Sequence, residues 1–379
     1  MDNKAFLLGR VLLRFGGGEE AESILGELSA AAFDADGALW VSSDELSSGR
    51  ITLSRLQADG QGIFGRHTQF ELREFVDLPA DGDDKTEADI EGLDVADHYL
   101  WFTGSHASKR SRPKGKDREK DLSRLARVEV EANRFLLGRI PLLGSTPMRS
   151  GPNPDQPSQQ LHAARLADGA GGNVLIECLR QDPHLGSFLQ TMHGADGMET
   201  LLPLASKENG FDIEGLAVLG RRLFLGLRGP VLRGWATLLE IEPRDESPGR
   251  LGLAVISIRE RRYRKHFLDL DGLGIRELAR DGDDLLILAG PTMTLQGTLR
   301  VYRLRDAGNL AHDSITPAGD ARLEPLFDLP ITPGGDNAEG FALYPWPVRQ
   351  GLLVVYDGPV KARLPEPGSV YADVFQLPY

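Results

Sequence analysis

Short runs of hydrophobic residues recur along the chain in pairs, and a polar or glycine-containing turn separates the two runs of each pair. The second runs of four such pairs stand at residues 99–102, 222–225, 285–288 and 352–356. Runs of this length, bounded by turn residues, are typical of buried β-strands. The pattern therefore predicts a series of β-hairpins, and no long helical periodicity competes with it.

A short acidic motif opens these hairpins and marks them as copies of one unit. Asp89-Ile90-Glu91-Gly92-Leu93 recurs as Asp212-Ile213-Glu214-Gly215-Leu216, and weaker copies stand at residues 269–273 and 337–341. A fixed repeat of this kind is the sequence signature of solenoids and propellers. The motif thus indicates a repeat architecture rather than two unrelated domains.

Two further units, at residues 28–41 and 161–176, align on the second apolar run without the acidic motif, which makes six units. Each unit continues with alternating segments suited to two outer strands, as at residues 125–130. We therefore expect an all-β fold, a six-bladed β-propeller with four-stranded antiparallel blades, as a single domain over residues 1–379. The last unit ends with its third strand, so the strand from Phe6 to Phe15 is expected to close the last blade.

Composition narrows the class of protein. Hydrophobic residues make up 41% of the chain and charged residues 26%, which excludes disordered and collagen-like classes. The net charge of −13 argues against nucleic-acid and anionic-membrane binding. The single cysteine, Cys178, lies in an apolar run and is expected to be a small core residue. With no secretory signal and no apolar stretch of about 20 residues, we expect a cytoplasmic protein.

Two hydrophilic segments interrupt the strand pattern. The segment near residues 106–121 is strongly basic, and the segment near 144–160 is rich in Pro, Ser and Gly. Both are expected to be surface loops inserted in the propeller. Solvation is the simplest explanation of the basic run, and contact with an anion or a partner is the alternative.

The repeat alignment predicts two rings of side chains at one end of the central channel. The inner ring, at the start of the innermost strands, comprises Ala30, Glu91, His162, Glu214, Asp271 and Glu339. The outer ring, where the second strands end, comprises Asp44, Ser105, Arg180, Arg228, Ala289 and Asp357. The inner ring is therefore mainly acidic.

Carboxylates that converge on a narrow channel need a cation, shared protons or arginine partners. Glu91, Glu214, Asp271 and Glu339 are candidate ligands of Ca²⁺ or Mg²⁺, since hard cations prefer oxygen. The alternative is structural, because each Glu can pair with an arginine of a neighbouring blade and each motif Asp can accept turn amides.

The outer ring offers groups that could bind an anionic or polar ligand. The candidates are Asp44, Ser105, Arg180, Arg228 and Asp357. His106 and His162 are candidate catalytic proton shuttles, although a histidine taken singly is more often structural.

The motifs at residues 89–93, 103–106 and 227–230 resemble a bacterial family of unknown function, domain-of-unknown-function family 3616, whose members look like propellers. That resemblance covers nearly the whole chain and implies no activity. More distantly, glutamate-glycine at the start of inner strands is similar to the esterase-like phytase propellers and to the calcium-dependent lactonases related to senescence marker protein and gluconolactonase. The lactonase element has proline after the glycine, whereas Leu or Phe follows it here.

The leading hypothesis is a propeller that binds a small polar or anionic ligand at the channel mouth, with a divalent cation as one means of binding it. If the site is catalytic, a metal-dependent hydrolase of an ester, lactone or phosphoester is expected. The alternative is a non-catalytic protein-interaction scaffold with a structural acidic ring, whose partner docks on the loops near residues 109–121 or 144–160.

Overall fold

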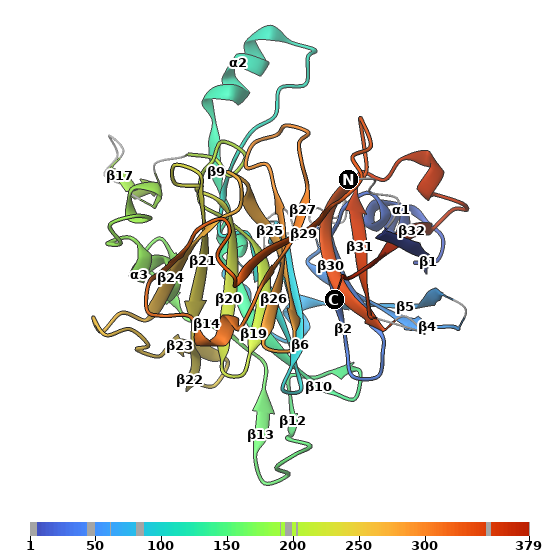
Figure 1. The fold of residues 1–379 in the computed structure, drawn as a ribbon, viewed down its shortest axis with the longest axis horizontal. Coiled ribbons are helices and arrows are strands. Elements are labelled where there is room, and N and C mark those ends of the chain that lie inside the picture. The colour runs from blue at the N-terminus through green and yellow to red at the C-terminus, as the bar shows by residue number, and fades with distance from the viewer. Residues whose placement is uncertain are drawn as a thin grey trace.

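A computed structural model describes residues 6–43, 50–60, 62–80, 87–189, 191–193, 199–201, 204–345 and 350–378. Over these residues the chain is mostly β-strand, and its strands form the blades of a propeller (Figure 1). The all-β class and the propeller-like architecture expected from the sequence are confirmed.

Each blade contains four antiparallel strands, which in blades 1 to 4 follow chain order from the channel outward. Blade 1 contains β2 (Leu28–Phe33), β3 (Leu39–Ser43), β4 (Thr52–Ala58) and β5 (Ile63–Glu71). Blade 2 contains β6 (Ile90–Ala96), β7 (Tyr99–Gly104), β10 (Leu137–Leu143) and β14 (Ala164–Leu166). Blade 3 contains β19 (Asp212–Leu219), β20 (Arg222–Gly229), β21 (Trp235–Ile241) and β24 (Tyr263–Asp269). Blade 4 contains β25 (Gly274–Asp281), β26 (Asp284–Gly290), β27 (Arg300–Leu304) and β29 (Leu323–Asp328). Blade 5 contains β30 (Asn337–Pro345), β31 (Gln350–Asp357), β32 (Ser369–Gln376) and β1 (Leu7–Arg14).

The described part of the chain therefore forms five blades and not the six that the repeat alignment predicts. The innermost strands pack in a closed cycle, β2 on β6, β6 on β19, β19 on β25, β25 on β30 and β30 on β2. Five separate hydrophobic clusters fill the five interfaces between neighbouring blades. With β6 directly against β19, no inner strand lies between blades 2 and 3.

The expected third unit, residues 161–176, belongs to the edge of blade 2. Its first run contributes β14, the fourth strand, and its second run forms helix α3 (Val174–Leu179). Asn173 caps this helix, because its side-chain oxygen accepts hydrogen bonds from the backbone N–H groups of Leu175 and Ile176. A short apolar run does not distinguish a buried strand from a buried helix, which explains the error. Cys178 lies in α3, partly buried against the hydrophobic cluster of blades 2 and 3.

The N-terminal strand closes the last blade, as the sequence predicts. β1 pairs antiparallel with β32 over a register that runs from Leu7 opposite Phe375 to Arg14 opposite Ser369. The first and last strands of the chain thus share one sheet. Because the fourth strand of blade 5 comes from the start of the chain and the other three from its end, closure of the ring requires both segments.

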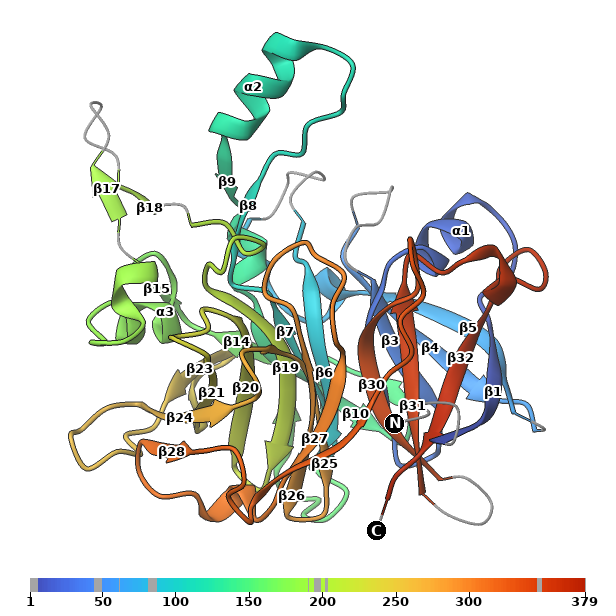
Figure 2. The ribbon, with the colours of Figure 1, turned by 45° about the horizontal axis from the view of Figure 1, so that its top comes forward.

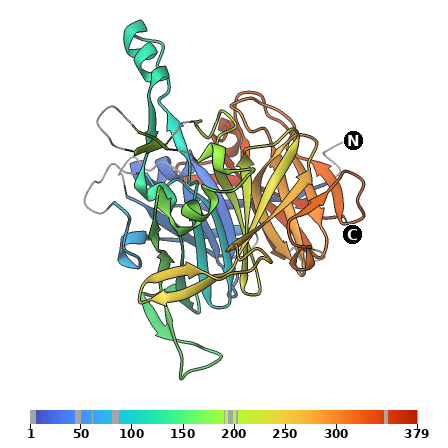
Figure 3. The same ribbon diagram turned by 90° about the vertical axis from the view of Figure 1, so that its left-hand side faces the viewer.

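Several elements lie outside the blades. The segment from residue 108 to residue 130 forms an arm, with a two-stranded base and a helix at its tip, that projects from the body (Figures 1 and 3). Its parts are β8 (Ser108–Arg110), α2 (Arg118–Ala126) and β9 (Val128–Val130). The hairpin of β12 (Ser150–Pro152) and β13 (Gln160–His162) projects from the opposite end (Figure 1).

The remaining helices and strands are short. They are α1 (Glu19–Leu25), β11 (Thr146–Pro147), β15 (Asp168–Gly169), β16 (Gly172–Asn173), β17 (Thr191–His193), β18 (Glu199–Leu201), β22 (Pro243–Ser247), β23 (Arg250–Leu253) and β28 (Ser314–Thr316), with 3₁₀ turns at Leu72–Glu74, Ala132–Phe135, Gly186–Phe188, Ala307–Asn309 and Lys361–Arg363. No helix among the described residues is long and apolar enough to cross a membrane.

Glycine in the repeated motif allows neighbouring inner strands to approach each other closely. A Cβ atom added to Gly92 would lie 2.7 Å from Cβ of Leu216 on the next blade. A Cβ atom added to Gly215 would likewise come too close to Leu278, and one added to Gly340 would come too close to Ala30. The motif glycine is therefore a packing requirement at the narrow axis of the ring.

We expect the substitution Gly92→Val to destabilise the protein, because the added side chain forces β6 away from β19. Overpacking of this kind costs about 1–3 kcal/mol of the free energy of unfolding. Urea unfolding monitored by circular dichroism measures the change. Gly17→Val is the matched control, since nothing lies within 4 Å of a Cβ atom at Gly17. Equal unfolding midpoints for the two variants would contradict the packing role.

Candidate functional site

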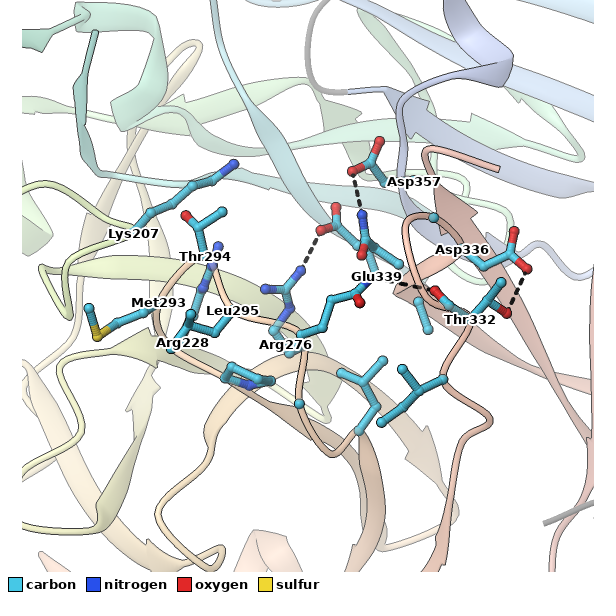
Figure 4. A pocket seen from close by; sticks show the side chains of 18 residues that line it. Lys207, Arg228, Arg276, Met293, Thr294, Leu295, Thr332, Asp336, Glu339 and Asp357 are labelled. Carbon is cyan, nitrogen blue, oxygen red and sulfur yellow. Dashed lines mark hydrogen bonds and ion pairs between the residues drawn. The ribbon is translucent and has the colours of Figure 1, made fainter. Parts of the chain in front are cut away.

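A cavity of about 200 Å³ opens at the end of the channel where the inner strands begin. Its walls come from blades 3, 4 and 5 and from the loops between their strands. The charged residues that line it are Lys207, Arg228, Arg276, Asp336, Glu339 and Asp357, and the loop at residues 291–297 forms much of the remaining wall. Figure 4 shows Lys207, Arg228 and Thr294 on one side, Asp336, Glu339 and Asp357 on the other, and Arg276 between them.

The inner strands share a local irregularity that positions the ring residues. The register of each inner strand shifts at its start, as between Ile213 and Gly215 in β19, so that one residue is left out of the ladder. That residue is Ser29 in β2, Glu91 in β6, Glu214 in β19 and Arg276 in β25, and in β30 both Glu339 and Gly340 lie outside the ladder. The structure thus confirms the equivalence of the three glutamates.

The structure contradicts the placement of Asp271 and Ala30 in this ring. Arg276 holds the position in blade 4 that the alignment gives to Asp271, and Ser29 holds the position given to Ala30. Asp271 lies in the turn after β24, exposed, in the left-handed region with φ 62°, and pairs with Arg300 at 3.4 Å. The sequence Asp269-Leu270-Asp271-Gly272-Leu273 imitates the motif but forms a turn.

Arg276 is the cation around which two of the glutamates gather. Its Nε lies 2.9 Å from Oε2 of Glu214 on blade 3, and its Nη2 donates a hydrogen bond to Glu339 on blade 5. Glu214 also accepts a hydrogen bond of 2.8 Å from Nη1 of Arg228. Of the three ways to tolerate converging carboxylates, the structure shows arginine pairing at Glu214 and Glu339.

Burial and neighbouring charges alter the protonation of the carboxyl groups around this network. Burial raises the pKa of Glu339, and the charges of Asp357 and Glu214 add to the effect while Arg276 opposes it. Burial and the charge of Glu214 raise the pKa of Asp212 well above its usual range, against the opposing charge of Arg228. Asp212 therefore takes up a proton more readily than an ordinary aspartate, and a proton there reduces repulsion beside Glu214.

Lys207 adds a cation at the open side of the cavity. Desolvation lowers the pKa of its ammonium group, but the carboxylates of Glu339, Glu91 and Asp89 outweigh that effect and raise it. The like charge of Arg228, on the same side of the cavity, opposes this rise in the pKa of Lys207, because two neighbouring cations repel each other. An anion between them would relieve this repulsion.

Of the outer-ring candidates, Arg228 and Asp357 line the cavity, and Ser105 and Arg180 do not. Ser105 is buried and connects blades 2 and 3, because its carbonyl accepts a hydrogen bond of 2.8 Å from the backbone N–H of Ile213. Arg180 lies at the C-terminal end of α3. Asp44 falls outside the described residues.

Neither histidine lies at the cavity. His106 is buried and pairs with the carbonyl of Gly104 through Nδ1 and with the amide of Asn173 through Nε2, both at 2.8 Å. Burial lowers the pKa of His106 to about 4, so the ring is neutral at neutral pH and holds the Asn173 cap in place. His162 is exposed in β13, on the hairpin at the opposite end of the molecule (Figure 1). The expected convergence of these histidines on the channel mouth is therefore wrong.

The motif Asp89 takes part in a separate ion-pair cluster. Its carboxylate accepts a hydrogen bond from Nη1 of Arg134, a buried arginine that also pairs with Glu87 at 3.0 Å and with Glu131 at 3.2 Å. The cluster connects the start of β6 to the segment before β10. Asp89 is thus held by an arginine side chain, whereas the sequence predicts that the motif Asp accepts turn amides.

Sequence reasoning missed Lys207, Arg276 and the loop at residues 291–297. A signal for Arg276 exists in the sequence, because Gly274-Ile275-Arg276-Glu277 has isoleucine directly before the ring position, as Asp212-Ile213-Glu214-Gly215 does. Lys207 precedes its blade and has no repeated counterpart. The described residues contain no group of three or more His, Cys, Asp or Glu side chains arranged to hold a metal ion.

The chain belongs to a family of proteins of unknown function (DUF3616), which matches residues 27–373. This confirms the resemblance drawn from the sequence motifs. No curated protein matches the chain.

Several solved structures align with most of the chain at low identity. The PQQ-bound form of an aldose sugar dehydrogenase from Streptomyces coelicolor aligns at 13% identity with a TM-score of 0.35, over 98% of this chain and 97% of that chain. The catalytic domain of a Coprinopsis cinerea GH62 α-L-arabinofuranosidase aligns at 10% identity and a TM-score of 0.38, over 98% and 97%. The Malassezia sympodialis allergen Mala s 1 aligns at 10% identity and a TM-score of 0.39, over 93% of each chain. These similarities are too low to carry an argument about activity.

We expect Glu214→Gln to destabilise the protein strongly, because it removes the charge that Arg228 and Arg276 share. Breaking a buried ion pair by removal of one partner costs about 3–5 kcal/mol of the free energy of unfolding. The control is Glu324→Gln, which breaks the half-exposed pair with Arg305 and should cost at most about 1 kcal/mol. Chemical unfolding of both variants gives the comparison, and similar losses in the two would show that the network around Arg276 adds no stability.

Proposed function

We propose that this protein binds a small polar ligand with an anionic group in the cavity at the channel mouth. The observation that carries the proposal is the convergence of Lys207, Arg228 and Arg276 on one cavity. The volume of about 200 Å³ suits a ligand below drug size, since drug-sized sites begin at about 300 Å³. Arginine and lysine together provide the directional donors and the point charge that phosphate and carboxylate groups require.

The anionic group belongs on the side of Lys207 and Arg228. Glu339 and Asp357 occupy the other side and would repel it (Figure 4). The buried Nε of Arg228 has no hydrogen-bond partner among the described residues, and a bound oxyanion could supply one. Hydroxyl groups of the same ligand could donate to Glu339 and Asp357.

A divalent cation is the other means of binding that the acidic ring suggests. Glu91, Glu214 and Glu339 would be its ligands. Arginine-based binding is the better-supported form of the proposal, because Arg276 already neutralises Glu214 and Glu339 from between them. If the site is catalytic, we propose hydrolysis of an ester, lactone or phosphoester, with the buried carboxyl group of Glu339 as the proton-transferring group because its pKa is raised.

Titration calorimetry with inorganic phosphate tests the binding proposal. Lys207→Ala should weaken phosphate binding about tenfold, because a charge-assisted hydrogen bond contributes about 1.5–3 kcal/mol. Lys116→Ala, on the exposed arm, is the matched control and should bind phosphate as the unmodified protein does. Absence of phosphate binding in the unmodified protein, or equal affinities for all three proteins, would reject an anion site at this cavity.

Thermal melts with Ca²⁺, Mg²⁺ and EDTA test whether the folded protein binds a divalent cation. A cation that binds the folded protein raises the melting temperature by mass action, and EDTA reverses that rise. Melting temperatures that respond to neither metal nor chelator would reject the cation and leave binding through arginine and lysine.

We also propose a second, non-catalytic function, which is self-association through the arm. The positive charge and the exposed leucines of the arm favour it. The arm at residues 108–130 contains nine Lys and Arg against four Asp and Glu, on a chain whose net charge is −13. Helix α2 buries none of its residues, and Leu122 and Leu125 are exposed on it. The arm projects away from its own body (Figure 2), and the rest of the chain carries a surplus of Asp and Glu, so a second copy offers the arm opposite charge.

We expect the protein to dimerise at low ionic strength and to dissociate at high ionic strength, because the contact is electrostatic. Sedimentation velocity measures the masses. Leu122→Ser with Leu125→Ser should abolish the dimer, whereas Val255→Ser with Ile258→Ser, at exposed apolar positions elsewhere, should not. A monomer at every protein concentration and ionic strength would reject self-association through the arm.

A further inference from the structure

The cationic cavity has an apolar rim. Met293, Leu295 and Ile331 line it, and their relative exposures are 50%, 68% and 50%. Large apolar side chains that are exposed singly are ordinary on protein surfaces, but three of them at the mouth of one charged cavity require an explanation. None of the three contributes to the hydrophobic clusters that fill the blade interfaces.

Backbone and side-chain contacts hold the rim in position. Met293 forms a β-bridge with Glu208 of the segment before blade 3, and the backbone N–H of Leu295 donates to the carbonyl of Met293 at 2.7 Å. The side-chain amide of Gln296 donates to the carbonyl of Thr332 at 3.4 Å. The loop at residues 291–297 thus joins blade 3 to blade 5 across the mouth and presents its apolar side chains there.

We propose that the ligand is amphiphilic, with an oxyanion for Lys207 and Arg228 and an apolar body that covers Met293, Leu295 and Ile331. This inference rests on the proposed anion-binding function and specifies the class of ligand. The oxyanion is a phosphate or a carboxylate, and the apolar body is an aryl group or a short alkyl chain. A closed cavity of about 150 Å³ holds benzene, so about 200 Å³ with an open mouth has room for an aromatic ring and its charged group.

Removal of the rim's apolar surface from water would favour binding of such a ligand. Burial of apolar surface contributes about 25 cal/mol per Å², so partial coverage of two or three rim side chains by a ring contributes enough for a tenfold gain in affinity. A purely polar ligand, such as a free sugar acid, would leave the rim exposed. The rim therefore selects for ligands with an apolar part.

Calorimetric titration with two ligand pairs tests the inference. The pairs are inorganic phosphate with phenyl phosphate, and acetate with phenylacetate, which also distinguish a phosphate from a carboxylate as the anionic group. We expect the aromatic member of the preferred pair to bind at least about tenfold more tightly than its small counterpart. In the double variant Met293→Ser with Leu295→Ser this ratio of affinities should fall to about one.

A control variant and the pattern of binding distinguish failure of the amphiphilic-ligand inference from failure of the proposed anion binding. Val255→Ser with Ile258→Ser removes exposed apolar side chains away from the cavity and should preserve the ratio. Phosphate or acetate that binds as tightly as its aromatic counterpart, or a ratio that the rim variant does not change, overturns the amphiphilic ligand and leaves anion binding intact. Failure of all four probes to bind overturns the proposed function together with the inference.

Discussion

The buried contacts of Arg276 with Glu214 and Glu339 are the interaction on which the site depends. A single guanidinium group in blade 4 connects the inner strands of blades 3 and 5, and Arg228 extends the network to the cavity wall. Buried charges are tolerated only when they are paired and hydrogen-bonded, so each of these side chains is confined to one arrangement by the others. The cavity keeps its shape because the blades around it cannot move apart without breaking these pairs.

Duplication and divergence are both visible at the channel mouth. The five inner strands share one backbone irregularity at their starts, which presents one side chain of each blade to the same opening. Three of these side chains are glutamates, one is an arginine and one is a serine. The backbone therefore repeats while the chemistry does not, and the arginine among the glutamates makes a closed, largely neutralised network out of what would be an acidic ring.

Beyond the ion pairs of Arg276, the cavity wall also includes residues from outside the inner strands. Lys207 and the loop at residues 291–297 come from connections between strands. Loops on a rigid scaffold are the usual location of binding residues, because the scaffold fixes their ends while their sequences vary. The charge of Lys207 and the apolar side chains of Met293 and Leu295 would thus provide specificity that the ring itself does not.

The sequence alone determined the all-β class, the hairpin repeat, the equivalence of Glu91, Glu214 and Glu339, and the closure of blade 5 by the N-terminal strand. These follow from local hydrophobic patterns and from the number of strands available, both of which are properties of the chain. Residues 125–130, predicted as an outer blade strand, lie instead in the arm, at the end of α2 and in β9. Only the tertiary structure decided that the blades number five in the described residues, because the run at 174–179 is equally compatible with a strand and with the capped helix that it forms. Tertiary structure also decided that Arg276 occupies the ring in place of Asp271, and that His106 is a buried structural residue. Such outcomes depend on which blades are neighbours and on register shifts of one or two residues, and a pattern of apolar and polar positions does not specify either.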